Sequence, residues 1–362
     1  MIKITPPIPP RPPGLDAALD ELVFSTWDQD FLKTEPGVRG REDVVVTRFE
    51  DALRFTIPWL SEHVDLANAR IVEIGCGSGS STVALGLHAK SVQGYDIDDG
   101  GVRATRARAA AYGLTNVNVF TVTPDALLSA VIEHATDANV FMLYAVLEHL
   151  TYPERIETLT TLWNALPPGG LLVVVETPNR LTYVDRHTTE LEFFHLLPDE
   201  LAIALLDRVP RDAFKASMRE PVRRGAQAAA LSRIRWGLGA SYHEFLVSIH
   251  EPLADIVVAD GFETEMTQFF YTGIDETLLV KFFLEQPVTE PIGFARGVLN
   301  VILRKPSCDD DRAAARAFNA ERRRLIAAPP PLPLPPPPPP QPPPPPTIRG
   351  LIRERIRKRF GL

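Results

Sequence analysis

Short apolar segments alternate with predicted helices through the first half of this 362-residue chain. The segment 171–175 contains only Leu and Val, which is typical of a strand covered on both faces by helices. This alternation predicts an α/β fold with a doubly wound parallel sheet, whose ligand lies at the carboxyl ends of the strands where strand order reverses. The predicted strands lie at 71–74, 91–96, 117–122 and 171–175, with a further strand in the segment 140–150 and a helix at about 101–112.

A glycine-rich turn directly follows the first of these strands. Gly75, Gly77 and Gly79 let the backbone turn tightly and approach a ligand that a Cβ atom would push away. The turn therefore predicts a nucleotide-type cofactor held by main-chain amides. The dinucleotide fingerprint requires Gly or Ala where this chain has Ser80, so an NAD-dependent oxidoreductase is disfavoured. A purely structural tight turn is the other alternative.

The turn reads E-x-G-x-G-x-G, with Glu73 two residues before the first glycine. This form resembles motif I of the class I S-adenosylmethionine-dependent methyltransferases. Further motifs of that family follow in the expected order. The Leu147-Glu148-His149 sequence resembles the branch that includes the ubiquinone and menaquinone methyltransferases. The other motifs are Asp96 after the second strand, Pro124-Asp125-Ala126 after the third, and an L-x-P-G-G turn at 166–170.

The resemblance implies that S-adenosylmethionine is the cofactor. By position in the family motifs, Asp96 binds the ribose hydroxyls and Asp125 meets the adenine amino group. The predicted cofactor-binding residues are Glu73, Gly75, Cys76, Gly77, Gly79, Asp96, Ile97, Asp125, Ala126 and Tyr144.

The resemblance covers about residues 45–305 and implies a Rossmann-like, seven-stranded sheet. It places the last helix at 254–260, the sixth strand at 261–266 and an antiparallel seventh strand at 297–304. Residues 1–44 are predicted to be a Pro-rich lead with a helical cap, and 181–253 a lid over the acceptor. Residues 306–328 are predicted to form a charged helix.

Composition limits the compartment and the partners. An apolar content of 45%, with no long apolar run, predicts a soluble protein without a secretory signal or a membrane span. Two cysteines predict no disulfide framework and a cytoplasmic location, and no Cys/His spacing indicates a zinc site, so no metal is predicted. The net charge of −8 disfavours a nucleic-acid substrate.

The C-terminal residues differ from this globular pattern. Residues 329–347 are almost all proline, which favours an extended polyproline linker or a ligand for an aromatic groove. Residues 348–362 are rich in Arg, with apolar residues at helical spacing. This basic amphipathic tail is predicted to make a peripheral contact with an anionic membrane surface, at its inner face, or to remain a solvated tail.

Most of the candidate catalytic residues lie after the fifth strand, and one, His149, follows the fourth. The segment 177–198 carries T-P-N-R, D-x-H and F-F-H-x-L-P patterns, which resemble bacterial methyltransferases of surface-glycan and secondary pathways. A neutral histidine suits the removal of a proton from an alcohol or phenol. The predicted catalytic residues are His187, oriented by Asp185, then His195 and His149, with Tyr242 or His243 as further alternatives.

These features favour an O-methyltransferase that acts on a hydroxyl of a sugar, a glycolipid or a related small molecule. The alternative is a degenerate methyltransferase fold that binds partners through its polyproline segment. The segment 269–283 is predicted to be β-rich and to serve as pocket cover or dimer contact. The sequence leaves the acceptor and the oligomeric state open.

Overall fold

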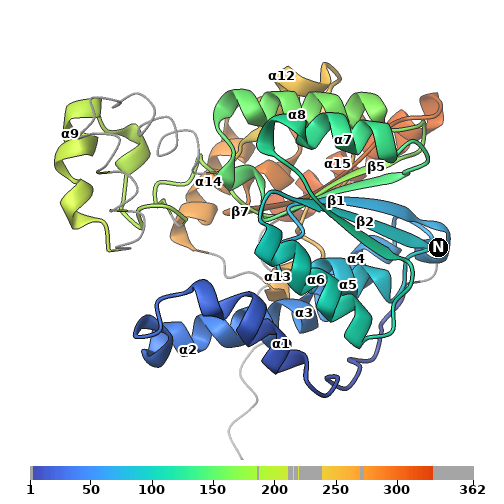
Figure 1. Cartoon of the computed structure of the whole chain (residues 1–362). Helices are drawn as coiled ribbons and strands as arrows, with labels where there is room; N and C mark the ends of the chain where they lie inside the picture. Colours follow the sequence, from blue (N-terminus) through green and yellow to red (C-terminus); the bar gives the residue numbers. More distant parts are fainter. Residues whose placement is uncertain are drawn as a thin grey trace, which may run out of the picture. The chain divides into compact units, whose positions relative to one another are not determined.

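Seven strands form one sheet in the order β3-β2-β1-β4-β5-β7-β6 in the computed structural model (Figure 1). The structure describes residues 3–185, 187–210, 215, 219, 239–269 and 273–328. Strands β1 to β5 are parallel, and β7 pairs antiparallel with both β5 and β6. This confirms the predicted doubly wound sheet with an antiparallel seventh strand. The strands are β1 (Arg70–Ile74), β2 (Ser91–Asp96), β3 (Val117–Thr121), β4 (Val140–Tyr144), β5 (Leu171–Pro178), β6 (Val257–Ala259) and β7 (Val298–Arg304).

Strand order reverses at β1, which pairs with β2 on one side and β4 on the other. The connections after β1 and β4 therefore leave the sheet next to each other. In open α/β sheets this crevice is where ligands bind. The glycine loop follows β1, and the Leu147–His149 turn follows β4.

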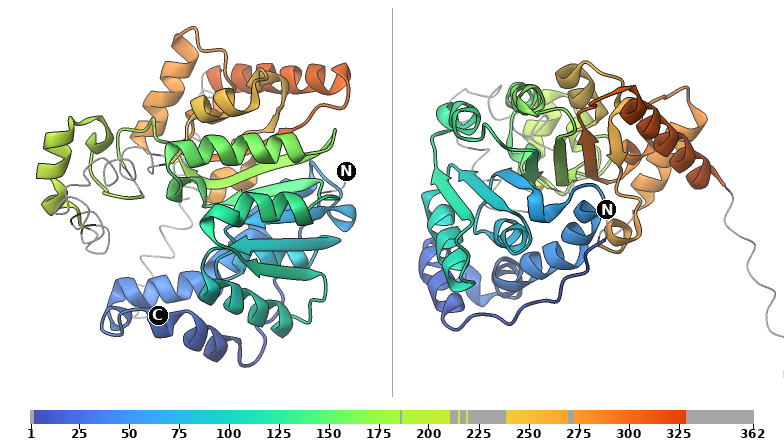
Figure 2. Two further views of the ribbon diagram at one scale, coloured as in Figure 1. Left: turned by 45° about the horizontal axis from the view of Figure 1, so that its top comes forward. Right: turned by 90° about the vertical axis from the view of Figure 1, so that its right-hand side faces the viewer.

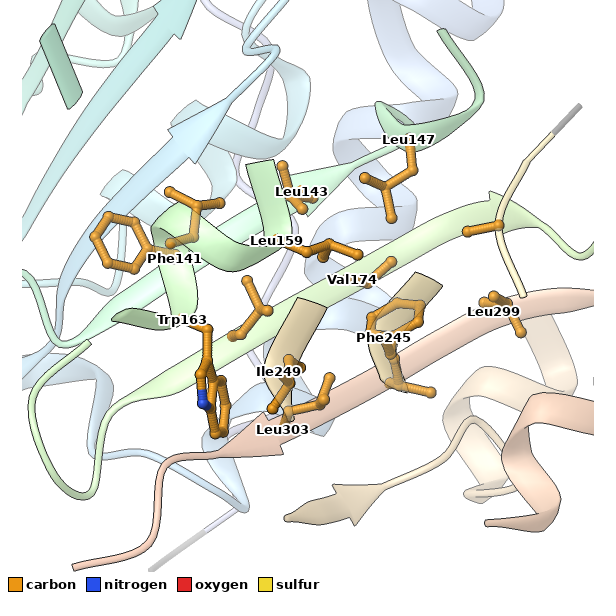
Figure 3. Packing of buried hydrophobic residues seen from close by; sticks show 14 of the residues in the cluster. Phe141, Leu143, Leu147, Leu159, Trp163, Val174, Phe245, Ile249, Leu299 and Leu303 are labelled. Atoms are coloured by element: carbon orange, nitrogen blue, oxygen red, sulfur yellow. The ribbon is translucent and has the colours of Figure 1, made fainter. Parts of the chain in front are cut away.

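Helices cover both faces of the sheet (Figures 1 and 2). On one face, Phe141 and Leu143 of β4 pack with Leu159, Phe245 and other apolar residues of the helices (Figure 3). This face is covered by α7 (Leu127–His134), α8 (Tyr152–Ala165), α12 (Tyr242–Ile249) and α14 (Ile274–Glu285). The other face is covered by α3 (Arg48–Asp51), α4 (Ile57–Ser61), α5 (Ser80–Gly86), α6 (Asp99–Ala111) and α13 (Thr264–Phe269).

Two N-terminal helices, α1 (Leu15–Leu22) and α2 (Glu35–Glu42), precede α3, and π-helical turns at Asp43–Thr47 and Ala52–Thr56 flank α3. The buried Arg108 of α6 donates to the carbonyls of Val44 (2.8 Å), Val45 (3.2 Å) and Ser78 (3.1 Å). Because Ser78 belongs to the glycine loop, this guanidinium fixes the N-terminal helices against the loop.

The remaining helices are short or peripheral, apart from α15 (Asp309–Ala327), which lies within the predicted charged segment. No helix of the described residues is long and apolar enough to cross a bilayer. The others are α9 (Asp199–Ala204) and 3₁₀ turns at Phe24–Thr26, Phe31–Lys33, Leu66–Asn68, Pro124–Ala126, Leu147–His149, Phe194–Leu196, Leu206–Arg208, Leu253–Asp255 and Ile292–Ala295.

Three predicted elements are wrong. The sixth strand is Val257–Ala259 rather than 261–266, and α12, not 254–260, is the helix before it. Gly261 has a φ of +78°, so the chain turns there instead of extending. The predicted β-rich segment 269–283 is mostly the helix α14, while 270–272 lie outside the described residues. An apolar run such as 278–284 does not by its periodicity distinguish a buried strand from a helix.

Candidate functional site

The glycine loop has the backbone geometry that its sequence predicts. Gly75, Gly77 and Gly79 all have positive φ, at +76°, +49° and +82°. A Cβ at Gly75 would lie 2.5 Å from Val146 Cγ2, and one at Gly79 would lie 2.8 Å from Thr105 Cα. A Cβ at Gly77 would meet no atom within 4 Å. Packing therefore requires the outer two glycines, whereas Gly77 borders open space that a ligand can approach.

Asp96 connects the end of β2 to this loop. One carboxylate oxygen accepts from the Gly77 amide at 2.7 Å, and the other accepts from the Asp98 amide at 2.9 Å. A carboxylate offers about four lone-pair sites, so Asp96 keeps acceptor capacity for two ribose hydroxyls. The predicted ribose ligand thus also holds the loop in place.

Glu73 lies beneath the loop, fully buried in β1. Its carboxyl oxygens accept from the hydroxyls of Ser81 and, at 2.6 Å, Thr82, both in the first turn of α5. Burial raises the pKa of Glu73 to about 7. Glu73 therefore ties β1 to α5 and supports the loop. Cys76 is buried against Val102 and Val119, and burial raises the pKa of its thiol.

The other predicted cofactor residues surround the same strand ends. Ile97 is 57% exposed directly after β2, and Asp125 and Ala126 are exposed in the 3₁₀ turn after β3. Tyr144 ends β4 and is buried, with its hydroxyl 3.5 Å from Glu176 Oε1. Roles in cofactor binding for these four side chains stay predictions.

Glu148, His149 and His187 come together beside the loop. One ligating atom from each lies within 4.8 Å of those of the other two, and the imidazole centroids are 4.9 Å apart in an edge-to-face arrangement. Glu148 and His149 belong to the 3₁₀ turn after β4, while His187 belongs to the connection after β5. We call these three residues the Glu-His-His cluster. Sequence spacing did not reveal this cluster, because Glu148 and His149 are adjacent in the sequence whereas His187 lies far from them along the chain.

Glu148 is the buried member of this cluster, with 5% of its surface exposed. Burial raises the pKa of its carboxyl group to about 8. Within the described residues, its buried Oε2 has no hydrogen-bond partner. In the sequence, Glu148 stands out only as part of the Leu147-Glu148-His149 motif, which by itself predicts no role for the carboxylate.

Glu176 is a second carboxylate near the cluster that sequence reasoning missed. It lies at a register shift between β5 and β7, has a φ of +60°, and donates its amide to Asn300 Oδ1 at 2.9 Å. Burial raises its pKa to about 7. The only sign of this residue in the sequence is that a single acidic side chain follows the continuous apolar segment 171–175.

Asp185 acts on His187 through the backbone. Its carboxylate accepts from the amides of His187 (3.1 Å), Thr188 (2.9 Å) and Thr189 (2.6 Å), and from the Thr189 hydroxyl at 2.6 Å. Asp185 is itself buried. It therefore fixes the turn that carries His187, which is a positioning role.

The other predicted bases lie outside the Glu-His-His cluster. His195 lines a small cavity with Arg180, Thr182 and Asp185, and burial lowers its pKa. His243 is 3.1 Å from the Tyr152 hydroxyl, and Tyr242 packs edge-on against Phe283. These last contacts join α12 to α8 and α14.

The T-P-N-R motif has a clear structural role. Asn179 donates to the carbonyls of Phe294 (2.7 Å) and Arg296 (2.8 Å). Arg180 pairs with the fully buried Glu244 at 2.9 Å, and Arg155 approaches the same carboxylate at 3.4 Å. The motif thus holds the start of the segment after β5 against α12 and the turn before β7.

The strand order, the antiparallel β7 and the glycine loop beside Asp96 are those of a class I S-adenosylmethionine-dependent methyltransferase. Residues 72–172 match the model of a family described as a methyltransferase domain. The chain therefore carries a class I methyltransferase domain, as its motifs predict.

Several curated proteins are similar to part of the chain. The ribosomal protein L11 methyltransferase of Legionella pneumophila is 39% identical over 44% of this chain and 60% of its own length. The ubiquinone biosynthesis O-methyltransferase of Nitrosococcus oceani is 26% identical over 55% of this chain and 73% of its own. The carboxy-S-adenosyl-L-methionine synthase of Psychromonas ingrahamii is 25% identical over 42% and 68%. The chain spans about half to two thirds of the first of these relatives and its counterparts in other Legionella strains.

Among solved structures, the magnesium protoporphyrin IX methyltransferase of Synechocystis PCC 6803 is 18% identical and superimposes with a TM-score of 0.32. That match covers 45% of this chain and 79% of the other.

Proposed function

We propose that this protein transfers the methyl group of S-adenosylmethionine to a hydroxyl oxygen of a sugar, a glycolipid or a related small molecule. The methyltransferase domain and the glycine loop with Asp96 support the cofactor. The observation that carries the acceptor chemistry is the Glu-His-His cluster. It stands next to the cofactor loop, because Gly75 packs against Val146, which directly precedes the Leu147–His149 turn.

The reaction needs only a few protein groups. The acceptor oxygen attacks the methyl carbon, the carbon–sulfur bond breaks, and its electron pair stays on sulfur to give S-adenosylhomocysteine. Most of the rate gain comes from holding the oxygen in line with the methyl group and from excluding water. A hydroxyl must also lose its proton, and the Glu-His-His cluster supplies the polar groups placed for that step.

The relatives are named for different acceptors. One similar protein is named as a ubiquinone biosynthesis O-methyltransferase, whereas the ribosomal protein L11 methyltransferases are named for a protein substrate. The imidazoles and carboxylate of the cluster suit an acceptor whose proton must be removed, which an alcohol requires and an uncharged amine does not.

The test is methyl transfer from labelled S-adenosylmethionine to a panel of glycans, glycolipids, phenols and amines, using the full chain. Label that is recovered as an alkali-stable methyl ether supports O-methylation. His187→Ala should lower kcat at least about 100-fold, the usual scale for loss of a group that assists removal of the proton. His250→Asn is the matched control, because His250 is exposed at the end of α12 with a φ of +56°, a conformation that Asn tolerates. Label found only on amines would refute the proposal.

A location in the cytoplasm with contact at the inner membrane face belongs to the same proposal. It depends on the basic composition of 348–362, which lie outside the described residues. Cosedimentation with anionic vesicles, compared with a chain that ends at Ala328, tests it. Equal cosedimentation of both chains would contradict the contact.

A further inference from the structure

We infer that Glu148, His149 and His187 form a binding site for one divalent transition-metal ion. In its catalytic role, which rests on the proposed function, the ion binds the acceptor hydroxyl. One carboxylate and two imidazoles each offer a ligand atom, and these three atoms lie within 4.8 Å of one another.

The distances suit closure onto one ion. Metal bonds from imidazole nitrogen and carboxylate oxygen are about 2.0–2.2 Å long, so ligands of a tetrahedral site lie roughly 3.3 Å apart. Small side-chain rotations that shift each ligand atom by about 1 Å would bring the atoms to that spacing. His149 is exposed and His187 is half-buried, so both rings have room to adjust.

The buried carboxylate supplies a second, independent observation. Glu148 is only 5% exposed, and its Oε2 is inaccessible to solvent. This oxygen has no hydrogen-bond partner among the described residues. Buried polar atoms are nearly always satisfied, because an unpaired one is costly. An ion held between Glu148 and the two imidazoles would satisfy this oxygen.

Backbone features hold the ligands in place. Ala145, before the turn that carries Glu148 and His149, has a φ of +53° and donates its amide to Val175 at 2.9 Å. Non-glycine residues in this region are uncommon and cluster at functional sites. Asp185 fixes the turn that carries His187 through four hydrogen bonds. Both parts of the cluster are thus positioned by groups outside it.

The ligand types select the metal class. Two imidazoles and one carboxylate suit Zn²⁺, Co²⁺, Mn²⁺ or Fe²⁺, whereas Mg²⁺ and Ca²⁺ prefer oxygen ligands. Three protein ligands leave a position open for the acceptor oxygen. Coordination lowers the pKa of a bound hydroxyl, so the proton leaves to solvent and the resulting alkoxide attacks the methyl group. The ion undergoes no redox change.

Charged groups of both signs lie near Glu148, so their net effect neither favours nor opposes a bound cation. Glu176 places negative charge toward Glu148, while Arg48 and Arg155 place positive charge toward it. The ligand set, the distances between the ligand atoms and the unsatisfied oxygen therefore support the metal site.

The experiment uses the full chain without a histidine tag, stripped with a chelator. Titration with Co²⁺ is followed by visible absorption, and titration with Zn²⁺ by calorimetry. We expect one ion per chain with micromolar or tighter affinity. Glu148→Gln and His187→Ala should each weaken binding more than about tenfold, since even outer-shell changes weaken metal sites by about 10–100-fold. His250→Asn, which removes an exposed imidazole elsewhere, should leave the affinity unchanged.

Affinity for S-adenosylhomocysteine, measured on the same samples, shows that each variant is folded and keeps the two proposals apart. Absence of Zn²⁺ and Co²⁺ binding in protein that binds S-adenosylhomocysteine would overturn the metal site alone. Metal binding that is equally strong in Glu148→Gln and His187→Ala would also overturn it. Metal binding that depends on both residues, in protein that does not bind S-adenosylhomocysteine, would support the metal site and contradict the proposed function.

Discussion

Replacing Asp96 with Ala should severely weaken cofactor binding. The side chain accepts two backbone hydrogen bonds, from Gly77 at 2.7 Å and from Asp98 at 2.9 Å. Its remaining lone pairs are predicted to accept from the ribose hydroxyls. A hydrogen bond to a charged group contributes about 1.5–3 kcal/mol. Loss of two bonds to ribose hydroxyls therefore costs at least about 3 kcal/mol, which corresponds to an increase in Kd of more than about 100-fold.

The loop adds to this loss. Without the carboxylate, the Gly77 amide has no fixed acceptor, so part of the ordering of the loop must occur when the ligand binds. Asp96→Asn keeps one acceptor oxygen and should have an intermediate effect. Asp98→Asn is the matched control, because Asp98 caps α6 through the amides of Gly100 and Gly101, and Asn caps equally well.

The assay is calorimetry with S-adenosylhomocysteine, with a thermal melt to show that each variant is folded. The expected order of affinity is wild type and Asp98→Asn, then Asp96→Asn, then Asp96→Ala. A folded Asp96→Ala protein whose Kd stays within threefold of wild type would refute the assignment of Asp96 to the ribose.

Three further predictions concern stability, measured by urea denaturation. Gly79→Ala should destabilise the fold by more than about 2 kcal/mol, because it combines a positive φ with a Cβ clash. Gly113→Ala is the control and should cost only about 1 kcal/mol, because Gly113 has a positive φ but open space around its Cβ position. Glu244→Gln should cost about 3–5 kcal/mol, because it leaves the buried Arg155 without its counter-charge; a loss below 1 kcal/mol would contradict this role. Glu73→Gln should reduce the loss of stability between pH 5 and pH 8; an unchanged slope would contradict the raised pKa.

The sign of the Glu73 effect follows from proton binding. Burial raises the pKa of Glu73 from 4.5 to about 7 in the folded protein, so between these values the folded state holds more protons than the unfolded state. Stability contributed by this group therefore falls as pH rises through that window and is constant above it. The full effect is on the order of 3 kcal/mol. Glutamine does not titrate, so the comparison of the two slopes isolates this residue.

Local sequence patterns predicted the elements that build the cofactor site. The apolar strand, the glycines and Asp96 lie within one βαβ segment, and steric limits on the loop are readable from glycine spacing alone. The predicted second strand, 91–96, agrees with β2 at both ends. The edge of the sheet was harder to predict from the sequence. Strand β6 has only three residues and is defined by pairing with β7.

The acceptor side depends on contacts between distant segments. His187 reaches Glu148 and His149 only because β4 and β5 are neighbours and Asp185 fixes the following turn. Glu176 lies in the register shift between β5 and β7, where its backbone leaves the regular strand conformation with a φ of +60°. Neither the cluster nor the shift has a local sequence signal, so histidines could be proposed one by one but not as a group.

The most direct test of the account is calorimetry of the full chain with S-adenosylmethionine, S-adenosylhomocysteine and NAD, repeated with a chain that ends at Ala328. We expect micromolar binding of both adenosyl ligands, no binding of NAD, and no change in affinity on truncation. Absence of binding to either adenosyl ligand by folded protein would contradict it.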